Sequence, residues 1–263
     1  MQNLVPIVLC IGGLDPSGGA GITADLVTLR DLKCHGTAIM TANTLQDSYN
    51  CRAYFPTSAK LLKQQIQLLF DDFNIAVVKV GMLGSAEIVD ALVDALPQPL
   101  NIPLVLDPIW QAGGGGSLTE PDVFPKIVQR LLPLCTLITP NIIELEQLLK
   151  ALDQSRLPTT SLDPTPLFST GVRAILVTGG ETSGEHIEDN LYTLDHKLYC
   201  HRWPRKSGLF HGTGCTLSTA ICAYLAHHKS LAEAVTLAEK YLHQRLDDYI
   251  QFGHGQFFMG SHK

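Results

Sequence analysis

Residues 211–215, His-Gly-Thr-Gly-Cys, lead into an apolar, helix-like stretch and could bind a negatively charged group. A loop that closes into a helix start presents unpaired main-chain N–H groups and the positive end of the helix dipole. Gly212 and Gly214 lack a Cβ atom, so a phosphate can approach the backbone. The same field would lower the pKa of the Cys215 thiol. A buried cysteine in an ordinary helix cap explains the segment equally well, so both interpretations stay open.

A second glycine-rich segment spans 12–26 and matches neither the dinucleotide-binding fingerprint nor the Walker A loop. Glycines at 18, 19 and 21 predict a turn into a helix that carries Asp25. A flexible strand-to-helix turn accounts for the glycines. Asp15 and Asp25 need a further explanation, because acidic residues at a ligand-facing strand end must be paired or take part in binding.

Asn141 and Glu144 lie three residues apart at a predicted helix start, so their side chains share one face. Their oxygens could hold water molecules around Mg²⁺. The same pair also fits a capping box, and taken alone we favour the cap. Met82 stands in a glycine-flanked segment after a strand, which allows a place in a pocket wall as well as the usual core position.

Short apolar runs alternate with amphipathic stretches along most of the chain. The runs are rich in Val, Ile and Leu without polar alternation, which predicts buried parallel strands over 6–11, 37–42, 76–81, 103–108, 136–140 and 174–180. Apolar spacings of three and four predict helices over 57–73, 85–97, 141–152 and 230–246. The alternation predicts an α/β fold with three α/β/α layers, a central, mostly parallel sheet and helices on both faces, in one domain over 1–263.

Two regions interrupt this alternation: 152–170 is expected to be a loop with one short helix, and 189–203 a hairpin at a sheet edge. Clusters of Gly, Asp, Asn and Thr directly follow all six predicted strands. Ligands of such sheets bind beyond the carboxyl ends of the strands. We therefore expect one site that these clusters build together.

The composition excludes several classes of partner. The 263 residues carry a formal charge of −6, with a pI near 5.9, which argues against nucleic acid or an anionic membrane. Seven scattered cysteines without a C-x-x-C pair indicate reduced thiols rather than disulfides or a zinc site. No apolar run is long enough to span a membrane, and the N-terminal run lacks a basic flank, so we expect a cytoplasmic protein.

Taken together, the motifs resemble those of the hydroxymethylpyrimidine and phosphomethylpyrimidine kinases of thiamine biosynthesis, within the ribokinase-like superfamily. The resemblance covers nearly the whole chain and is carried by DPSGGAGITADL, TANTLQDS, KVGMLGSAEIV, VLDPIW, TPNIIELEQLL, VTGG and HGTGCTLSTAICAYL. It implies a ribokinase-like fold and an ATP- and Mg²⁺-dependent kinase. Its substrate would be the hydroxymethyl group of 4-amino-5-hydroxymethyl-2-methylpyrimidine, followed by the monophosphate.

The resemblance also implies roles for single residues. Gln46 matches the glutamine that hydrogen-bonds the aminopyrimidine, and the residues implied to line the same pocket are Gly13, Asp25, Thr44, Met82 and His211. Those implied at the ATP phosphates are Asn141, Thr178, Gly180, Gly212 and Gly214, with Asp107 and Glu144 at the metal. The implied anion hole is Gly212, Thr213, Gly214 and Cys215, in which Cys215 stands where ribokinase has an aspartate base.

The chain departs from the family pattern at two cations. Thr178 replaces a lysine of the family's K-G-G-H, and 111–116 reads QAGGGG where A-K-S-G is usual. These changes put the second phosphorylation in question. Two alternatives stay open: a pyridoxal kinase, because the same framework phosphorylates a related hydroxymethyl group, and a non-catalytic pyrimidine-binding or regulatory relative. The family resemblance also implies a homodimer.

Overall fold

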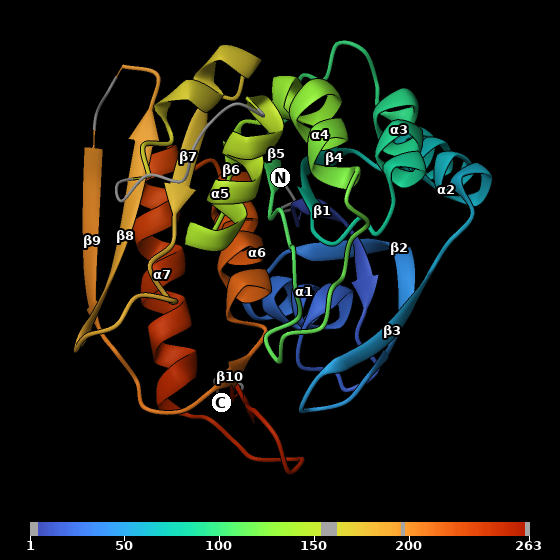
Figure 1. The fold of residues 1–263 in the computed structure, drawn as a ribbon. Coiled ribbons are helices and arrows are strands. Elements are labelled where there is room, and N and C mark those ends of the chain that lie inside the picture. Colours follow the sequence, from blue (N-terminus) through green and yellow to red (C-terminus); the bar gives the residue numbers. More distant parts are fainter. Residues whose placement is uncertain (1–4, 154–161, 196–197, 261–263) are drawn as a thin grey trace.

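The computed structural model describes residues 5–153, 162–195 and 198–260. A nine-stranded sheet forms its centre (Figure 1), in the order β3-β2-β1-β4-β5-β6-β7-β8-β9. The strands are β1 (Ile7–Leu14), β2 (His35–Gln46), β3 (Cys51–Pro56), β4 (Ile75–Val80), β5 (Leu104–Leu106), β6 (Leu137–Ile138), β7 (Ala174–Val177), β8 (His186–Thr193) and β9 (Leu198–Pro204). The six strands from β2 to β7 in this order pair in parallel, and β3, β8 and β9 are antiparallel.

Helices cover both faces of the sheet, as the sequence predicts. One layer contains α1 (Gly21–Asp31), α6 (Thr213–Ala226) and α7 (Leu231–Asp247), and the other α2 (Ala59–Asp72), α3 (Ala86–Ala95), α4 (Val123–Lys126) and α5 (Ile142–Leu152). Strand β1 explains the continuous apolar pattern, because Val8 and Cys10 pack under the first layer while Leu9 and Ile11 pack under the second. The predicted three-layer α/β/α fold is confirmed.

Side chains cap the starts of three predicted helices. The Ser58 and Ser85 side chains accept hydrogen bonds from the main chain at the starts of α2 and α3. Ser230 and Glu233 form a capping box at the start of α7. The four predicted helices therefore occur within a few residues of the expected bounds.

Three parts of the fold differ from the sequence prediction. Strand β2 runs on to Gln46 and pairs with β3, which the prediction lacks. A short helical segment precedes β6: α4 continues as one turn of π-helix over Ile127–Leu131 and a 3₁₀ turn over Leu132–Leu134. A two-stranded sheet joins β10 (Phe210–His211) to β11 (Phe257–Phe258), so the end of the described chain returns to the start of α6. Each is too short or too irregular to give a clear period.

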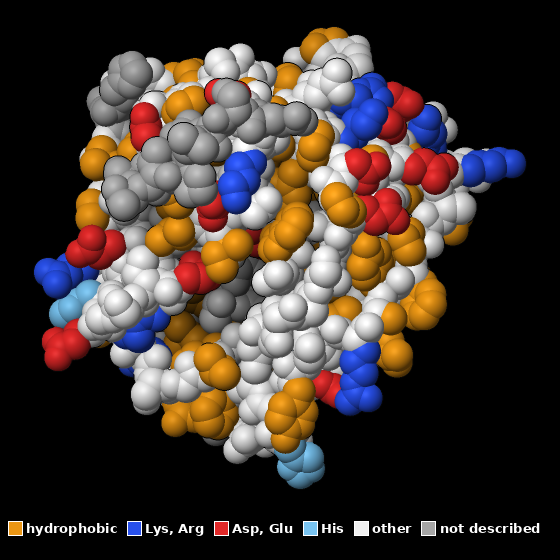
Figure 2. Space-filling model, viewed as in Figure 1, with side chains coloured by type: hydrophobic (Ala, Val, Ile, Leu, Met, Phe, Trp, Pro, Cys, Tyr) orange, Lys and Arg blue, Asp and Glu red, His pale blue; other side chains and the backbone are white. Residues whose placement is uncertain are grey.

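The predicted hairpin is confirmed, since β8 and β9 pair at one edge of the sheet. The predicted short helix in 152–170 is a 3₁₀ helix over Thr165–Thr170, while residues 154–161 lie outside the described part. In the described ranges no helix has the length and apolarity needed to cross a membrane. Figure 2 shows basic and acidic side chains side by side over α2 to α4, where Lys63 and Arg130 both pair with Asp94.

Candidate active site

A cavity of about 520 Å³ lies at the carboxyl ends of the parallel strands, where the sequence predicts the ligand site. The ends of β1 and β2 and the segments that follow β4, β5, β6 and β7 line it together with the start of α6. The structure brings every predicted site residue to its wall: Gly13, Asp25, Thr44, Gln46, Met82, Asp107, Asn141, Glu144, Thr178, Gly180, His211, Gly212, Thr213, Gly214 and Cys215.

The start of α6 has the form of an anion cradle. Gly212 is the N-cap in the left-handed region, with φ +76°, and a Cβ atom there would lie 2.0 Å from the Gly19 carbonyl oxygen. No side chain in the described ranges caps α6, which leaves the N–H groups of its first turn for a ligand. At Gly214 a Cβ atom would find Asp107 Oδ2 at 3.6 Å as its nearest neighbour, so the backbone there is open. This geometry favours the anion-binding interpretation of the segment.

Cys215 follows in the first turn of α6, and its thiol differs from the sequence expectation. Its side chain is buried, and burial raises the pKa of the thiol to about 12, although the charge of Lys79 acts in the opposite direction. Withdrawal from water disfavours the thiolate, and this cost exceeds the stabilisation expected from the helix field. The expectation of a lowered pKa is wrong, and resting Cys215 is a neutral thiol.

Two buried carboxylates stand near the cradle. Asn141 and Glu144 form the favoured capping box, in which Asn141 Oδ1 accepts from the Glu144 N–H at 2.8 Å and Glu144 Oε2 accepts from the Asn141 N–H at 2.9 Å. Burial, and then the charge of Asp107, raises the pKa of Glu144 to about 8. Burial also raises the pKa of Asp107 to about 6. A cation between them would favour both ionised forms.

This donor set fits a magnesium ion that also binds phosphate. The described residues contain no group of three or more His, Cys, Asp or Glu side chains arranged for a metal. Mg²⁺ commonly takes one or two protein carboxylates and completes its shell with water and substrate phosphates. The Asp107 carboxylate lies beside the open backbone of Gly214, and Glu144 lines the same cavity, where its two oxygens accept from the main-chain N–H groups of Trp110 and Asn141 and keep further lone pairs for a cation.

Lys79 is a cavity residue that the sequence interpretation missed. Its side chain is 1% exposed, and its Nζ atom lies 3.1 and 3.0 Å from the two carboxylate oxygens of Asp25. Thr219 Oγ1 also donates to Asp25, at 2.6 Å. Asp25 is therefore engaged by protein groups at the cavity wall. One sequence feature could have revealed Lys79: it is a charged residue within the apolar run 76–81. A strand that is buried on both faces keeps such a side chain away from solvent, so it needs a buried partner.

Asp15 and Gln46 both lie against the same nitrogen of His211. His211 Nε2 lies 2.8 Å from Asp15 Oδ2 and 3.3 Å from Gln46 Nε2. Burial acts to raise the pKa of Asp15, but hydrogen bonds from His211 and Ser17 outweigh it and hold the pKa below its usual value. Asp15 is thus paired, as expected of an acidic residue at this strand end, by the Nε2–H of His211; that nitrogen has no lone pair left for the Gln46 amide, so Gln46 lies beside His211 and keeps its amide for a ligand.

The wall beside Gln46 is closely packed. Thr44 Oγ1 donates to the Leu14 carbonyl oxygen at 2.8 Å. Gly13 faces Met82, and a Cβ atom at Gly13 would lie 2.7 Å from the Met82 sulfur. Met82 therefore forms pocket wall, and the glycine at position 13 makes room for it.

Positive charge enters the cavity from the segment after β9. Arg205 donates to the carbonyl oxygens of Gly180 at 2.8 Å and Gly184 at 2.9 Å, and also to that of Thr182. The neighbouring Lys206 pairs with Asp247. Both Arg205 and Lys206 line the cavity. The loop in which Thr178 replaces the family lysine thus carries a cation from elsewhere in the chain, which the sequence pattern did not reveal.

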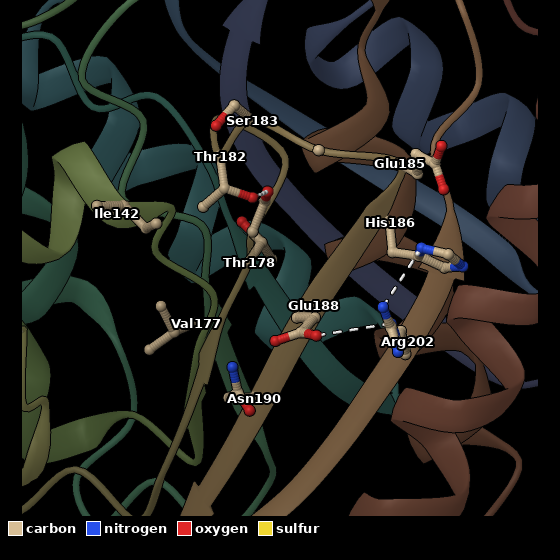
Figure 3. Close-up of a pocket in the computed structure, with 12 residues that line it drawn as sticks. Ile142, Val177, Thr178, Thr182, Ser183, Glu185, His186, Glu188, Asn190 and Arg202 are labelled. Atoms are coloured by element: carbon tan, nitrogen blue, oxygen red, sulfur yellow. Dashed lines mark hydrogen bonds and ion pairs between the residues drawn. The ribbon is translucent and has the colours of Figure 1, made fainter.

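A second hollow, of about 530 Å³, lies against β8 and β9 (Figure 3). Thr178 lines both hollows. The charged side chains of the second one are exposed and interact with one another, since Arg202 contacts His186 at 3.5 Å and Glu188 at 3.6 Å. It is a surface groove beside the predicted site.

The cavity lies at the end of a central, mostly parallel sheet, beside a helix start without a side-chain cap and two carboxylates. This is the arrangement of the ribokinase-like kinases, which transfer a phosphoryl group to small molecules. The chain belongs to the phosphomethylpyrimidine kinase family, whose sequence profile matches residues 15–260. It is similar to the hydroxymethylpyrimidine/phosphomethylpyrimidine kinases of Rhizobium meliloti, 33% identical over 96% of both chains, and of Escherichia coli, 34% identical over 94% of both.

Solved structures show the same fold. A Staphylococcus aureus pyridoxal kinase in complex with pyridoxal is 25% identical, with a TM-score of 0.85 over 98% of this chain and 94% of that one. A Clostridium difficile phosphomethylpyrimidine kinase is 31% identical, with a TM-score of 0.76 over 92% of this chain and 99% of that one. The predicted family and kinase class are confirmed.

Proposed function

We propose that this chain uses ATP to phosphorylate the hydroxymethyl group of 4-amino-5-hydroxymethyl-2-methylpyrimidine, and then the monophosphate product, within one domain. The observation that carries the proposal is that Gln46 and the open start of α6 line the same cavity. An amide that can both donate and accept suits the amino group and adjacent ring nitrogen of an aminopyrimidine. The names of the curated relatives support the same substrate.

The start of α6 would stabilise the phosphoryl group during its transfer from ATP to the acceptor. Phosphoryl transfer spreads charge over the three equatorial oxygens, so catalysis depends mainly on positioning and electrostatic stabilisation. The main-chain N–H groups at 213–215 would stabilise that charge without reorganising during the reaction. Asn141 and Thr178 would hold the remaining phosphates, and Arg205 would add positive charge at the Gly180 loop.

Magnesium would be held by Asp107 and Glu144, and when bound it neutralises charge on the ATP phosphates. The two carboxyls must lose their protons to bind it, which their raised pKa values make dependent on pH. Cys215 would orient the attacking hydroxyl as a neutral thiol, which already carries its proton and cannot take another. The hydroxyl proton would pass to an oxygen of the transferred phosphoryl group, because a loose transition state needs little deprotonation of the attacking oxygen before the bond to the leaving group weakens.

Phosphorus NMR tests the proposal. The chain, Mg-ATP and the aminopyrimidine alcohol should give ADP together with a monophosphate ester resonance, followed by a diphosphate pair if the second step is retained. ATP hydrolysis that does not depend on added pyrimidine would contradict the proposal. Omitting Mg²⁺, or replacing Glu144 by glutamine, should abolish the ester signal while the fold, checked by circular dichroism, is preserved.

A second acceptor is supported by the similarity to the pyridoxal kinase structure. Pyridoxal also presents a hydroxymethyl group on a nitrogen heterocycle, so the same cavity could orient it. Parallel assays with the two alcohols separate the candidates. A higher kcat/KM for pyridoxal would replace the pyrimidine as the proposed substrate.

We further propose a cytoplasmic homodimer. Large apolar side chains are exposed near the β3 edge and on α2, among them Leu45, Phe55 and Leu68. Such side chains favour burial against a second copy. Light scattering coupled to size-exclusion chromatography should give twice the chain mass of 28.7 kDa, and a monomer at micromolar concentration would contradict the proposal.

A further inference from the structure

The segment 253–258 contributes one residue, Gln256, to the cavity wall. Strand β11 pairs with β10, directly before the cradle, and Phe258 contacts His211 edge to face at 5.7 Å. The Gln256 N–H donates to the Ser48 carbonyl oxygen at 2.9 Å, and the Gly255 N–H donates to Ser48 Oγ at 3.1 Å. Ser48 lies two residues after Gln46, so this segment is fixed to the predicted acceptor end of the cavity.

Glycines make this close contact possible. A Cβ atom at Gly255 would lie 2.3 Å from the Ser48 carbonyl oxygen, and one at Gly114 would lie 1.8 Å from the Tyr49 carbonyl oxygen. Main chain from three distant parts of the sequence therefore meets at residues 48–49. Glycine has no side chain to keep these backbones apart.

Gln256 enters the cavity through space that Gly113 leaves open. A Cβ atom at Gly113 would lie 2.9 Å from Gln256 Nε2 and 3.5 Å from Gln256 Oε1. The Gln256 side chain lines the cavity although the residue is only 8% exposed. No hydrogen bond joins its amide to another side chain or to the backbone in the described residues.

An amide that faces a cavity without a protein partner is available to a ligand. The Gln256 nitrogen and oxygen are not among the fully enclosed, unpartnered polar atoms of the described residues, so water in the cavity can reach them, and a ligand that displaces this water must offer a polar atom in its place. Other polar groups of the acceptor end already have partners: Thr44 donates to Leu14, and His211 contacts Asp15. Gln256 is thus poised to bind the acceptor.

We propose that Gln256 is a specificity-determining residue whose Nε2–H donates to a ring nitrogen of the heteroaromatic acceptor. This inference rests on the proposed function. If Gln46 pairs with the amino group and the ring nitrogen beside it, N3, the second ring nitrogen, N1, still needs a donor of its own. The amides of Gln46 and Gln256, which lie far apart in the sequence, would then each hydrogen-bond one of the two nitrogens of the pyrimidine ring.

Steady-state kinetics of Gln256→Ala provide the main test. Loss of one hydrogen bond should raise KM for the aminopyrimidine alcohol roughly fivefold to tenfold. The KM for ATP and kcat at saturating acceptor should change less than about twofold, because they do not depend on this bond. Gln251→Ala is the matched control, since Gln251 lies in the same segment, is exposed and does not line the cavity.

Two further variants separate hydrogen bonding from packing. Gln256→Glu keeps the shape but removes the donor, so it should raise the acceptor KM at least as much as Gln256→Ala does. Gly113→Ala should displace the amide and raise the same constant. If Gln256→Glu keeps the wild-type KM, Gln256 serves packing and the inference is overturned.

An acceptor analogue with carbon in place of ring N1 completes the test. Wild type should bind this analogue roughly tenfold more weakly than the parent alcohol, whereas Gln256→Ala should bind both equally. Equal discrimination by the two proteins would overturn the inference and leave the proposed function intact. Wild type that neither binds nor phosphorylates the parent alcohol would overturn the proposed function, and the inference with it.

Discussion

Replacing Gly214 by alanine should separate folding from catalysis at the start of α6. A Cβ atom at this position meets Asp107 Oδ2 at 3.6 Å, an ordinary contact, and nothing nearer. Alanine within a helix is more stable than glycine by roughly 0.5–1 kcal/mol. For a chain of this size, that difference raises Tm by about 2 °C. We therefore expect Gly214→Ala to fold at least as well as wild type.

The same methyl group should prevent transfer. It would project into the space where a phosphoryl oxygen must approach the main-chain N–H groups of the cradle. Loss of one such donor typically lowers kcat by about 10²–10³-fold. The expected result is a variant with a slightly higher Tm and a kcat lower by that factor, measured by differential scanning fluorimetry and coupled ADP release.

Two companion variants calibrate this prediction. Ala232 holds the same second position in α7 and does not line the cavity, so Ala232→Gly should lower Tm by a similar amount without changing kcat. Gly212→Ala should lower Tm instead, because its φ is +76° and its Cβ atom would lie 2.0 Å from Gly19. Gly214→Ala with a kcat within about threefold of wild type would refute the cradle, since a donor of this kind is worth far more.

Three other changes have definite expected outcomes. Cys215→Ala should lower kcat by about 10²-fold, because the attacking hydroxyl loses the contact that positions it, and kcat of wild type should show no thiol ionisation between pH 6 and 9 because burial raises the pKa of that thiol to about 12; a near-wild-type rate would leave Cys215 a packing residue. Lys79→Met should lower the free energy of unfolding by about 3–5 kcal/mol in urea titrations, because it leaves Asp25 buried without its partner, and Lys79→Met with Asp25→Asn should recover part of the loss. Burial, and then the charge of Asp189, raises the pKa of Glu239 to about 8, so the folded state keeps a proton that the unfolded chain releases and stability falls as pH rises towards that value. Glu239→Gln should therefore gain Tm over wild type as pH rises from 5 to 8.5, and a constant difference would contradict this reasoning.

Much of the fold can be predicted from the sequence, because buried parallel strands appear as short apolar runs and amphipathic helices as apolar residues spaced three and four apart. The predicted helices over 85–97 and 230–246 begin at Ser85 and Ser230, and the structure shows that both side chains cap their helices. Strand β3 and the β10–β11 pair left no such pattern, since their stability comes from partners far away in the chain. The π-helical turn at Ile127–Leu131 does not follow the 3.6-residue period of an α-helix, so a search for that period does not find it.

Sequence predicts the site residues that stand in recognisable motifs. It misses those whose role depends on their surroundings in the folded protein. Gln46 lies at the end of β2 and Gly214 in the first turn of α6. The fold brings both residues to one cavity. Lys79 and Gln256 carry no motif, and only their burial shows that they matter. Cys215 was placed correctly, but its pKa was predicted in the wrong direction because sequence shows a helix start without the loss of water around it.

The β10–β11 pairing ties the phosphate cradle to residues 257–258, far from it in the sequence. During synthesis these residues leave the ribosome after every other described part of the cradle. A nascent chain that has already formed its central sheet therefore still lacks the partner strand of β10 and the Gln256 side chain in the cavity wall, and the cavity is complete only once this segment has emerged.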